Sequence, residues 1–240
     1  LFRSCVAATL LNEHPLLGCL ALLACIAVYA LIGALIHTRN LPSIVVTLGM
    51  SFIWMGGAVL LLPAPGGSAP HWLQSLVRIK TPWLPFAIIV CIVLALLVHA
   101  FLMRSPLGVV LRGAGGNPLA VAKAGWSLLR IKVSLYALAG SFGVLAGLFL
   151  VGLTTSADAT IALRYTLLSI AGVILGGGEF VGGRVSPIGA VLGALTLVLA
   201  GSLLSFMRIS PDWQIGAQGA ILILVLALRA AVNRLETRPL

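Results

Sequence analysis

Long apolar runs are the feature that most constrains how this sequence can fold. Crossing a bilayer takes about 20 predominantly apolar residues, each adding about 1.5 Å of helix. Seven stretches approach or reach that length, and the shortest of them contains Arg164. They are Leu16–His37, Ser43–Leu62, Trp83–Met103, Val133–Leu153, Ile161–Leu175, Pro187–Phe206 and Trp213–Leu228. The stretch Leu1–Leu11 is too short to span and fits part of a helix.

The composition excludes an ordinary soluble fold. Of 240 residues, 60% are apolar and 8% are charged, against about a quarter charged in soluble domains. Lipid must therefore cover much of the surface, and the net charge of +10 marks membrane orientation rather than a nucleic-acid surface. No run shows the two-residue alternation of barrel strands. We predict an all-α polytopic bundle with about seven full spans plus a partial N-terminal helix, forming a single transmembrane domain over residues 1–240.

The basic residues predict the topology. Alternate loops carry ten Lys and Arg on one side and five on the other, and positive charge is retained on the cytoplasmic side. The richer set includes Arg229, Arg234 and Arg238, so the C-terminus is expected in the cytoplasm. The poorer set includes Arg3, which this count places outside the membrane with the segment Leu1–Pro15.

Small residues recur at helical spacing in two of the runs. Ala139, Gly143 and Gly147 repeat every four residues in one run, and Gly189 and Gly193 do so in another. Such faces let helix backbones approach closely. They predict a compact bundle and indicate no particular function.

The longest cytoplasmic connection, residues 104–132, contains more than a linker. Gly113, Gly115 and Gly116 allow tight backbone turns, and Asn117 followed by Pro118 is typical of a helix start. A short helix is expected over Pro118–Ala124, ending at Gly125. Its surface is small and apolar, with Ala120 and Ala124 on it, which favours docking of another protein. The alternative is an interfacial helix lying on the membrane.

A second unusual connection, residues 176–186, is rich in glycine. Gly176, Gly177, Gly182 and Gly183 fall in the sequence GGGEFVGGR, followed by Pro187. This composition predicts a break in the membrane-embedded backbone. Glu179 and Arg184 are close enough in sequence to pair, either as a gating element or as a solvated turn.

No residue set predicts catalysis. The four histidines and five acids are scattered, no metal-ligand cluster is present, and no glycine-rich stretch has the spacing of a phosphate-binding loop. An enzyme is not expected, nor a bound cofactor. Thr47, Ser51 and Trp54 form a polar and aromatic stripe on one helical face, suited to hydrogen-bonding hydroxyls and covering a sugar ring. Ordinary helix packing explains the same stripe.

At its two glycine-containing loops the sequence resembles the permease subunits of bacterial ABC importers. The closer likeness is to the family that imports monosaccharides such as ribose, xylose and galactose, within the branched-chain amino acid and sugar permease superfamily. The family's GGN turn, alanine-rich helix and glycine match Gly115, Gly116, Asn117, Ala120, Ala124 and Gly125. In the family this is the coupling helix that docks on the ATP-binding subunit.

The second family signature falls on the other glycine-rich loop. Gly176, Gly177, Gly182, Gly183 and Arg184 match an apolar run into paired glycines and a basic residue, and Gly189 and Gly193 continue it. Further on, Ser210, Trp213, Gln214 and Gly219 match the start of the family's last helix. Pro118, Trp126 and Glu179 depart from the family pattern, so an altered docking surface is expected.

The resemblance implies partners and a location. It implies an ABC ATP-binding subunit that binds the ATP, a periplasmic sugar-binding protein, and a second permease subunit in a homo- or heterodimer, all at the bacterial inner membrane. Members usually have about ten spans, so the first helices of the family are expected to be missing here.

Three alternatives remain at this stage. A permease for branched-chain amino acids or other small solutes shares the architecture. An ion-driven secondary transporter is expected to carry an ionisable group within a span, where His99 is the one candidate. A membrane assembly subunit without transport is the third.

Overall fold

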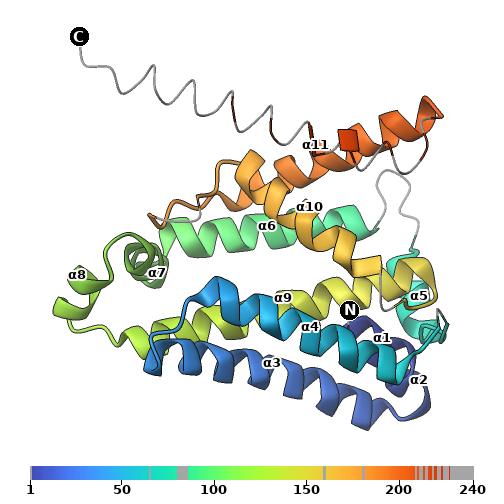
Figure 1. Cartoon of the computed structure of the whole chain (residues 1–240), viewed down its shortest axis with the longest axis horizontal. Helices are drawn as coiled ribbons and strands as arrows, with labels where there is room; N and C mark the ends of the chain where they lie inside the picture. Colours follow the sequence, from blue (N-terminus) through green and yellow to red (C-terminus); the bar gives the residue numbers. More distant parts are fainter. Residues whose placement is uncertain are drawn as a thin grey trace. The chain divides into compact units, whose positions relative to one another are not determined.

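The part of the chain that the structure describes folds mainly into α-helices. The computed structural model describes residues 2–64, 66–79, 86–158, 161–179 and 182–208, with 210, 213, 216, 217, 219, 220, 223 and 227. The helices of Figure 1 are α1 (Phe2–Ala8), α2 (Leu10–Glu13), α3 (Pro15–Thr38), α4 (Ser43–Leu61), α5 (His71–Val77), α6 (Phe86–Arg104), α7 (Pro106–Gly116), α8 (Pro118–Lys123), α9 (Leu128–Thr154), α10 (Ile161–Leu175) and α11 (Pro187–Phe206). The predicted all-α membrane fold is confirmed.

Five helices in the described part of the chain are long and apolar enough to cross a membrane: α3, α4, α6, α9 and α11. They correspond to five of the seven predicted spans. Helix α10 has the predicted bounds, but its 15 residues fall short of the about 20 that a span needs. The predicted span Trp213–Leu228 lies mostly outside the described residues. The N-terminal stretch, expected to be part of a helix, forms two short helices, α1 and α2.

Proline and small polar residues set where the helices begin. Helices α3, α7, α8 and α11 each start with proline, whose missing N–H and fixed φ suit the first helical position. The hydroxyl of Ser186 accepts a hydrogen bond from the Gly189 amide at 3.1 Å and so caps α11. Ser127 caps α9 in the same way through the Arg130 amide at 3.4 Å.

The chain divides into two compact units, Leu1–Val93 with Asn117–Leu163 and Leu94–Gly116 with Arg164–Leu240. In the first unit α3 runs beside α9, as Figure 1 shows. Their backbones approach at two glycines: a methyl group added to Gly33 would meet Tyr136 at 3.0 Å, and one added to Gly140 would meet Tyr29 at 3.2 Å. Glycine therefore sets the spacing of this helix pair.

The predicted small-residue stripe of α9 is shifted by one position at its start. Gly140 is buried against α3, whereas Ala139 is exposed. Gly143 and Gly147 instead face α1, where they contact Arg3 and Ser4. The difference arises because α9 packs against two helices rather than one, so its small residues serve two directions.

Two loops of the first unit are joined by backbone hydrogen bonds. The Gly66 amide donates to the Ala157 carbonyl at 3.0 Å, and the Ala157 amide donates back at 2.8 Å. The Ala69 amide adds a bond to the Thr155 carbonyl at 3.1 Å. The loop after α4 and the loop after α9 therefore form one ordered surface, beneath which Cys5, Ala58, Ala69 and Val151 are buried together.

In the second unit α10 crosses α11 at glycines and alanine. An added methyl group on Gly172 would lie 3.1 Å from the Cα of Ala194. Gly176 contacts the backbone of Gly189, and Gly193 contacts the carbonyl of Gly172. The two helices thus meet backbone to backbone, which confirms the packing role predicted for Gly189 and Gly193.

We expect Gly193→Ala to destabilise the protein, because the added methyl group would collide with the α10 backbone. Overpacking of this kind costs about 1–3 kcal/mol, and each kcal/mol lowers the Tm by about 2–4 °C at this size. The measurement is thermal unfolding of the detergent-purified protein.

Gly49→Ala on α4 is the matched control, because no atom lies within 4 Å of the methyl group it adds. Alanine is the better helix former by about 0.5–1 kcal/mol, so the Tm should stay unchanged or rise. Equal Tm changes in the two variants would contradict the backbone contact between α10 and α11.

Candidate functional site

The predicted docking helix is present as α8. The side-chain oxygen of Asn117 accepts a hydrogen bond from the Ala120 amide at 3.1 Å, so Asn117 is the predicted N-cap. The helix ends at Lys123, one residue before the predicted end, and Ala124 is its C-cap. Gly125 follows with φ +85°, the left-handed conformation expected of glycine after a helix.

Helix α8 presents its side chains to the exterior. None of its residues is buried, and Ala120 and Ala124 are both exposed. Leu119 is 73% exposed and Trp126, just beyond the helix, is 43% exposed. Small and apolar side chains standing free on so short a helix leave room for another surface to pack closely.

The segment before α8 differs from the prediction. Gly113, Gly115 and Gly116 were expected in tight turns, but all three lie within helix α7. The chain turns earlier, at Ser105, whose hydroxyl accepts a hydrogen bond from the Gly108 amide at 2.9 Å. The glycines are required for another reason, which is a close contact at the end of α7.

The end of α7 touches the glycine-rich segment directly. A methyl group added to Gly115 would lie 2.8 Å from the Cα of Gly183, and one added to Gly116 would lie 3.0 Å from the carbonyl oxygen of Gly182. Gly183 in turn contacts the carbonyl of Arg112. These four glycines, Gly115, Gly116, Gly182 and Gly183, form what we call the glycine junction. The two loop motifs, 67 positions apart in sequence, therefore meet in one unit.

The glycine-rich segment breaks the helical backbone, as predicted, between α10 and α11. Gly177, Gly182 and Gly183 have φ values of +92°, +104° and +69°, which residues with a Cβ rarely adopt. Gly176 instead packs on the α11 backbone. The predicted Glu179–Arg184 pair forms at 3.6 Å, and the Glu179 amide also donates to the Arg184 carbonyl at 3.1 Å.

The Glu179–Arg184 pair closes a turn rather than filling a core. The Arg184 side chain is 79% exposed and that of Glu179 is 33% exposed. Exposed pairs contribute at most about 1 kcal/mol. The geometry therefore matches the solvated turn of the two predicted alternatives.

The predicted substrate stripe does not present its hydroxyls. Thr47 donates its hydroxyl to the carbonyls of Ser43 and Ile44 at 2.9 and 3.1 Å, and Ser51 donates to the Leu48 carbonyl at 2.6 Å. Both hydroxyls thus bond to their own helix. Trp54 packs elsewhere, with its ring centroid 5.0 Å from that of Phe2.

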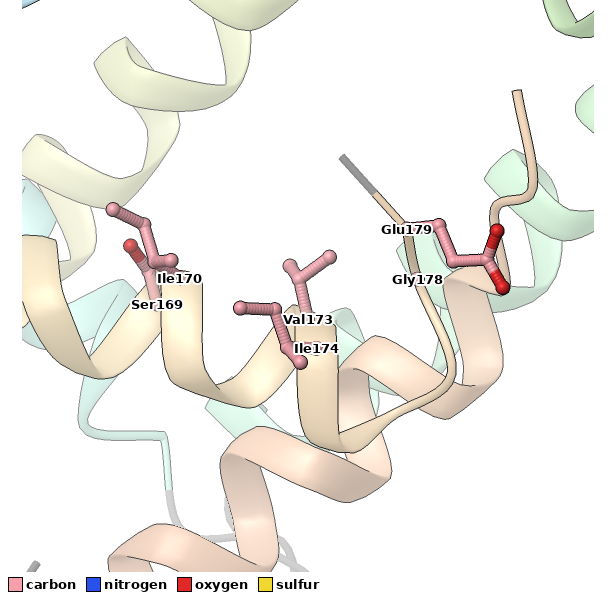
Figure 2. A pocket seen from close by; sticks show the side chains of 6 residues that line it. All are labelled: Ser169, Ile170, Val173, Ile174, Gly178 and Glu179. Atoms are coloured by element: carbon pink, nitrogen blue, oxygen red, sulfur yellow. The ribbon is translucent and has the colours of Figure 1, made fainter. Parts of the chain in front are cut away.

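A cavity of about 220 Å³ lies along α10 and the turn after it. Figure 2 shows Ser169, Ile170, Val173 and Ile174 on the helix, with the Glu179 carboxylate turned away from them. The Ser169 hydroxyl donates to the Thr166 carbonyl at 2.9 Å. A lining this apolar offers little to orient a polar solute.

The sequence did not predict a cluster around Arg3 inside the first unit. Arg3 was placed outside the membrane, but the structure packs it against Gly143, beyond the midpoint of α9. The guanidinium carbon lies 4.5 Å from the ring centroid of Tyr29, and the Tyr29 ring stacks on Trp54 at 6.3 Å. One arginine within an N-terminal apolar stretch is the signal that could have indicated this cluster.

Comparison with known proteins gives the family. The model of the family described as "branched-chain amino acid transport system / permease component" matches residues 2–226. The chain belongs to this family. The match covers both glycine loops and all five membrane-spanning candidates, so the chain is a multi-pass membrane protein and a permease component rather than an enzyme.

Several relatives have names that specify sugars. A galactose/methyl galactoside import permease protein of Haemophilus influenzae is 29% identical over 87% of this chain and 65% of its own length. A ribose import permease protein of Bacillus subtilis is 27% identical, over 82% of this chain and 62% of its own. A fructose import permease protein of Rhizobium meliloti is 27% identical, over 82% and 57%. This chain therefore spans less than two thirds of these relatives, and no solved structure matches it.

We expect Asn117→Ala to loosen α8, because loss of an N-cap costs about 1 kcal/mol. Backbone amides in α8 should exchange their hydrogens about five times faster. Hydrogen–deuterium exchange of the purified protein measures this effect. Asn117→Asp keeps the accepting oxygen and should leave exchange near the native rate; faster exchange in both variants would contradict the capping role.

The glycine junction makes a separate prediction. Gly183→Ala adds a methyl group to a left-handed residue and drives it into the Arg112 carbonyl, so conformational strain of about 1–2 kcal/mol is joined by an overpacking cost of about 1–3 kcal/mol. Gly125→Ala is the matched control, because Gly125 is also left-handed but has open space around it. Thermal unfolding should show the larger Tm loss for Gly183→Ala. Equal losses would contradict a close contact between Gly183 and the Arg112 carbonyl.

Proposed function

We propose that this chain is the membrane-spanning subunit of an ATP-driven importer and forms part of the path for a monosaccharide. The observation that carries the proposal is that relatives matching over four fifths of the chain are named as importers of galactose, ribose and fructose. The chain has a permease's apolar helices and offers the two loop motifs in contact with each other.

The first proposed partner is an ATP-binding subunit that docks on α8. The exposure of Leu119 and Trp126 supports this docking, because a short apolar helix left in water is costly unless another surface covers it. The partner binds and hydrolyses the ATP, so this chain itself requires no cofactor. Ala120 and Ala124 are the positions at which the partner surface approaches closest.

The glycine junction is the proposed route of the motion. Gly116 is followed directly by Asn117 and α8, so a push on α8 is delivered to the end of α7. The contact of Gly115 and Gly116 with Gly182 and Gly183 passes that displacement to the segment joining α10 and α11. Backbone contacts transmit small displacements because close-packed atoms leave no empty space into which they can move.

A sugar-binding protein is the second proposed partner. Its proposed docking surface is made by the loops at residues 63–80 and 154–164, which are joined by hydrogen bonds between Gly66 and Ala157. Such a joined surface suits docking better than two independent loops. The proposal has these loops on the periplasmic side of the bacterial inner membrane and the C-terminus in the cytoplasm, as the distribution of basic residues predicts.

A second permease subunit, identical or related, completes the proposal. Helices α4 and α6 expose large apolar side chains along most of their length, among them Phe52, Leu60 and Leu97. Lipid and a second permease chain are the proposed neighbours of these faces.

A permease for branched-chain amino acids is the second candidate, because the family description names such systems. The two candidates differ in the solute that stimulates ATP hydrolysis. Galactose, ribose or fructose should stimulate it in the first case, and leucine, isoleucine or valine in the second.

The test of coupling is Ala120→Asp combined with Ala124→Asp. Two buried charges without partners would oppose docking, and we expect sugar-stimulated ATP hydrolysis by the reconstituted transporter to fall at least tenfold, as about 1.4 kcal/mol of lost docking energy requires. Asn40→Asp, at an exposed position in the loop after α3 and outside both proposed docking surfaces, is the control and should hydrolyse ATP normally. Undiminished hydrolysis with the α8 double variant would reject α8 as the docking helix.

A further inference from the structure

Two buried hydrogen-bond donors without acceptors belong to side chains of the first unit that both contact the Tyr29 ring. The Nη2 atom of Arg3 and the Nε1 atom of Trp54 are both buried, and neither has a hydrogen-bond partner. Leaving a buried donor unsatisfied is costly, more so when it is charged. Native proteins keep such groups chiefly where they serve a function.

The donors lie deep within the bundle. Tyr29, Trp54 and Gly143, which surround them, each lie just past the midpoint of their helices α3, α4 and α9. A charge at this depth in a membrane protein is a functional candidate by default. Transporter binding sites are commonly found near the same level.

Arg3 lacks the partner that would explain it as structural. It makes no ion pair with a carboxylate of the described residues. Its contacts there are the Tyr29 ring, the bare backbone of Gly143 and the thiol of Cys25. None of these supplies a strong hydrogen-bond acceptor.

The geometry points to a binding site for a solute that carries a carboxylate. We propose that the Arg3 guanidinium binds this carboxylate and that the Trp54 indole N–H donates a hydrogen bond to another oxygen of the same solute. The two groups without partners, the Arg3 guanidinium and the Trp54 indole N–H, are hydrogen-bond donors, so the solute must supply hydrogen-bond acceptors. A guanidinium pairs with a carboxylate through two parallel bonds, which is stronger than its bond to a hydroxyl.

This inference rests on the proposed function and narrows its substrate class to acidic sugars. Because the Nη2 atom of Arg3 and the Nε1 atom of Trp54 are buried, we expect the solute to reach them only after the surrounding helices move. A cavity of about 40 Å³ is lined by Ser4, the neighbour of Arg3 in sequence, and by Ala157 and Asp158 of the loop after α9. It is the point at which we expect the opening to begin.

The test compares D-galacturonate with D-galactose, which differ at one carbon that is a carboxylate or an alcohol. We expect isothermal titration calorimetry of the detergent-purified transporter to show galacturonate binding roughly 10- to 100-fold more tightly, as a charge-assisted hydrogen bond provides. Equal or weaker binding of galacturonate in the native protein overturns the proposal.

Variants identify the residue responsible. Arg3→Met should abolish the preference for galacturonate over galactose, and Trp54→Phe should weaken both ligands several-fold. Arg39→Met is the matched control, because Arg39 is an exposed arginine of the same unit and its loss changes the net charge equally. An equal effect of Arg39→Met would show that the preference is only long-range attraction.

A packing role for Arg3 predicts a different pattern. Replacing a buried charge by an apolar side chain of similar length then raises the Tm and leaves both ligands unaffected, which would overturn the proposal. Should Arg3→Met not fold, Arg3→Lys keeps the charge without the paired geometry and should weaken galacturonate binding several-fold. Sugar-stimulated ATP hydrolysis with neutral sugars is measured separately, so failure of this inference leaves the proposed importer function standing.

Discussion

Close approach of helix backbones at glycine is the contact on which the rest of this structure depends. Lipid tails are as apolar as leucine, so helices in a membrane gain little from hiding apolar side chains and much from fitting closely. In one unit Gly33 and Gly140 bring α3 against α9, and in the other Gly172 and Gly193 bring α10 against α11. An added Cβ would make a tight contact at Gly33, Gly140 and Gly172 and would collide with the α10 backbone at Gly193.

The same physics accounts for the glycine junction. The end of α7 meets the segment between α10 and α11 through main-chain atoms of Gly115 and Gly183. Main-chain contacts have no rotamers to change, so a displacement on one side must appear on the other. This property suits the proposed transfer of motion from α8, and it explains why the two motifs need glycine for different local reasons. Gly115 is helical, whereas Gly183 is left-handed.

The position of Arg3 also depends on close packing at a glycine. Because Gly143 has no side chain, the guanidinium can lie directly on the α9 backbone and reach Tyr29. The aromatic ring compensates part of the cost of a charge in this setting, but the Nη2 atom remains without an acceptor. A group that satisfies it therefore gains more than the same contact would give in water.

The spacing of apolar residues, together with the residues that start and end helices, determined where the helices lie. The apolar runs predicted the five membrane-spanning candidates of the described residues within a few residues. Asn117 and Pro118 predicted the start of α8. Helix caps and a proline at the first helical position are local effects of neighbouring residues, so sequence suffices to predict them. The glycine-rich loops also identified the family, to which the comparison assigns the chain. Residue type and spacing suffice for such features.

Only the tertiary structure decided which partners these elements meet. Sequence could not show that Gly115 and Gly116 end a helix and touch Gly182 and Gly183, because that contact joins segments far apart in the chain. Nor could it show that the hydroxyls of Thr47 and Ser51 turn back on their own helix. The count of basic residues and spans placed Arg3 outside the membrane, yet α1 lies alongside α9 and packs Arg3 against Gly143. Depth and contact are properties of packing, and packing is fixed by all the helices together.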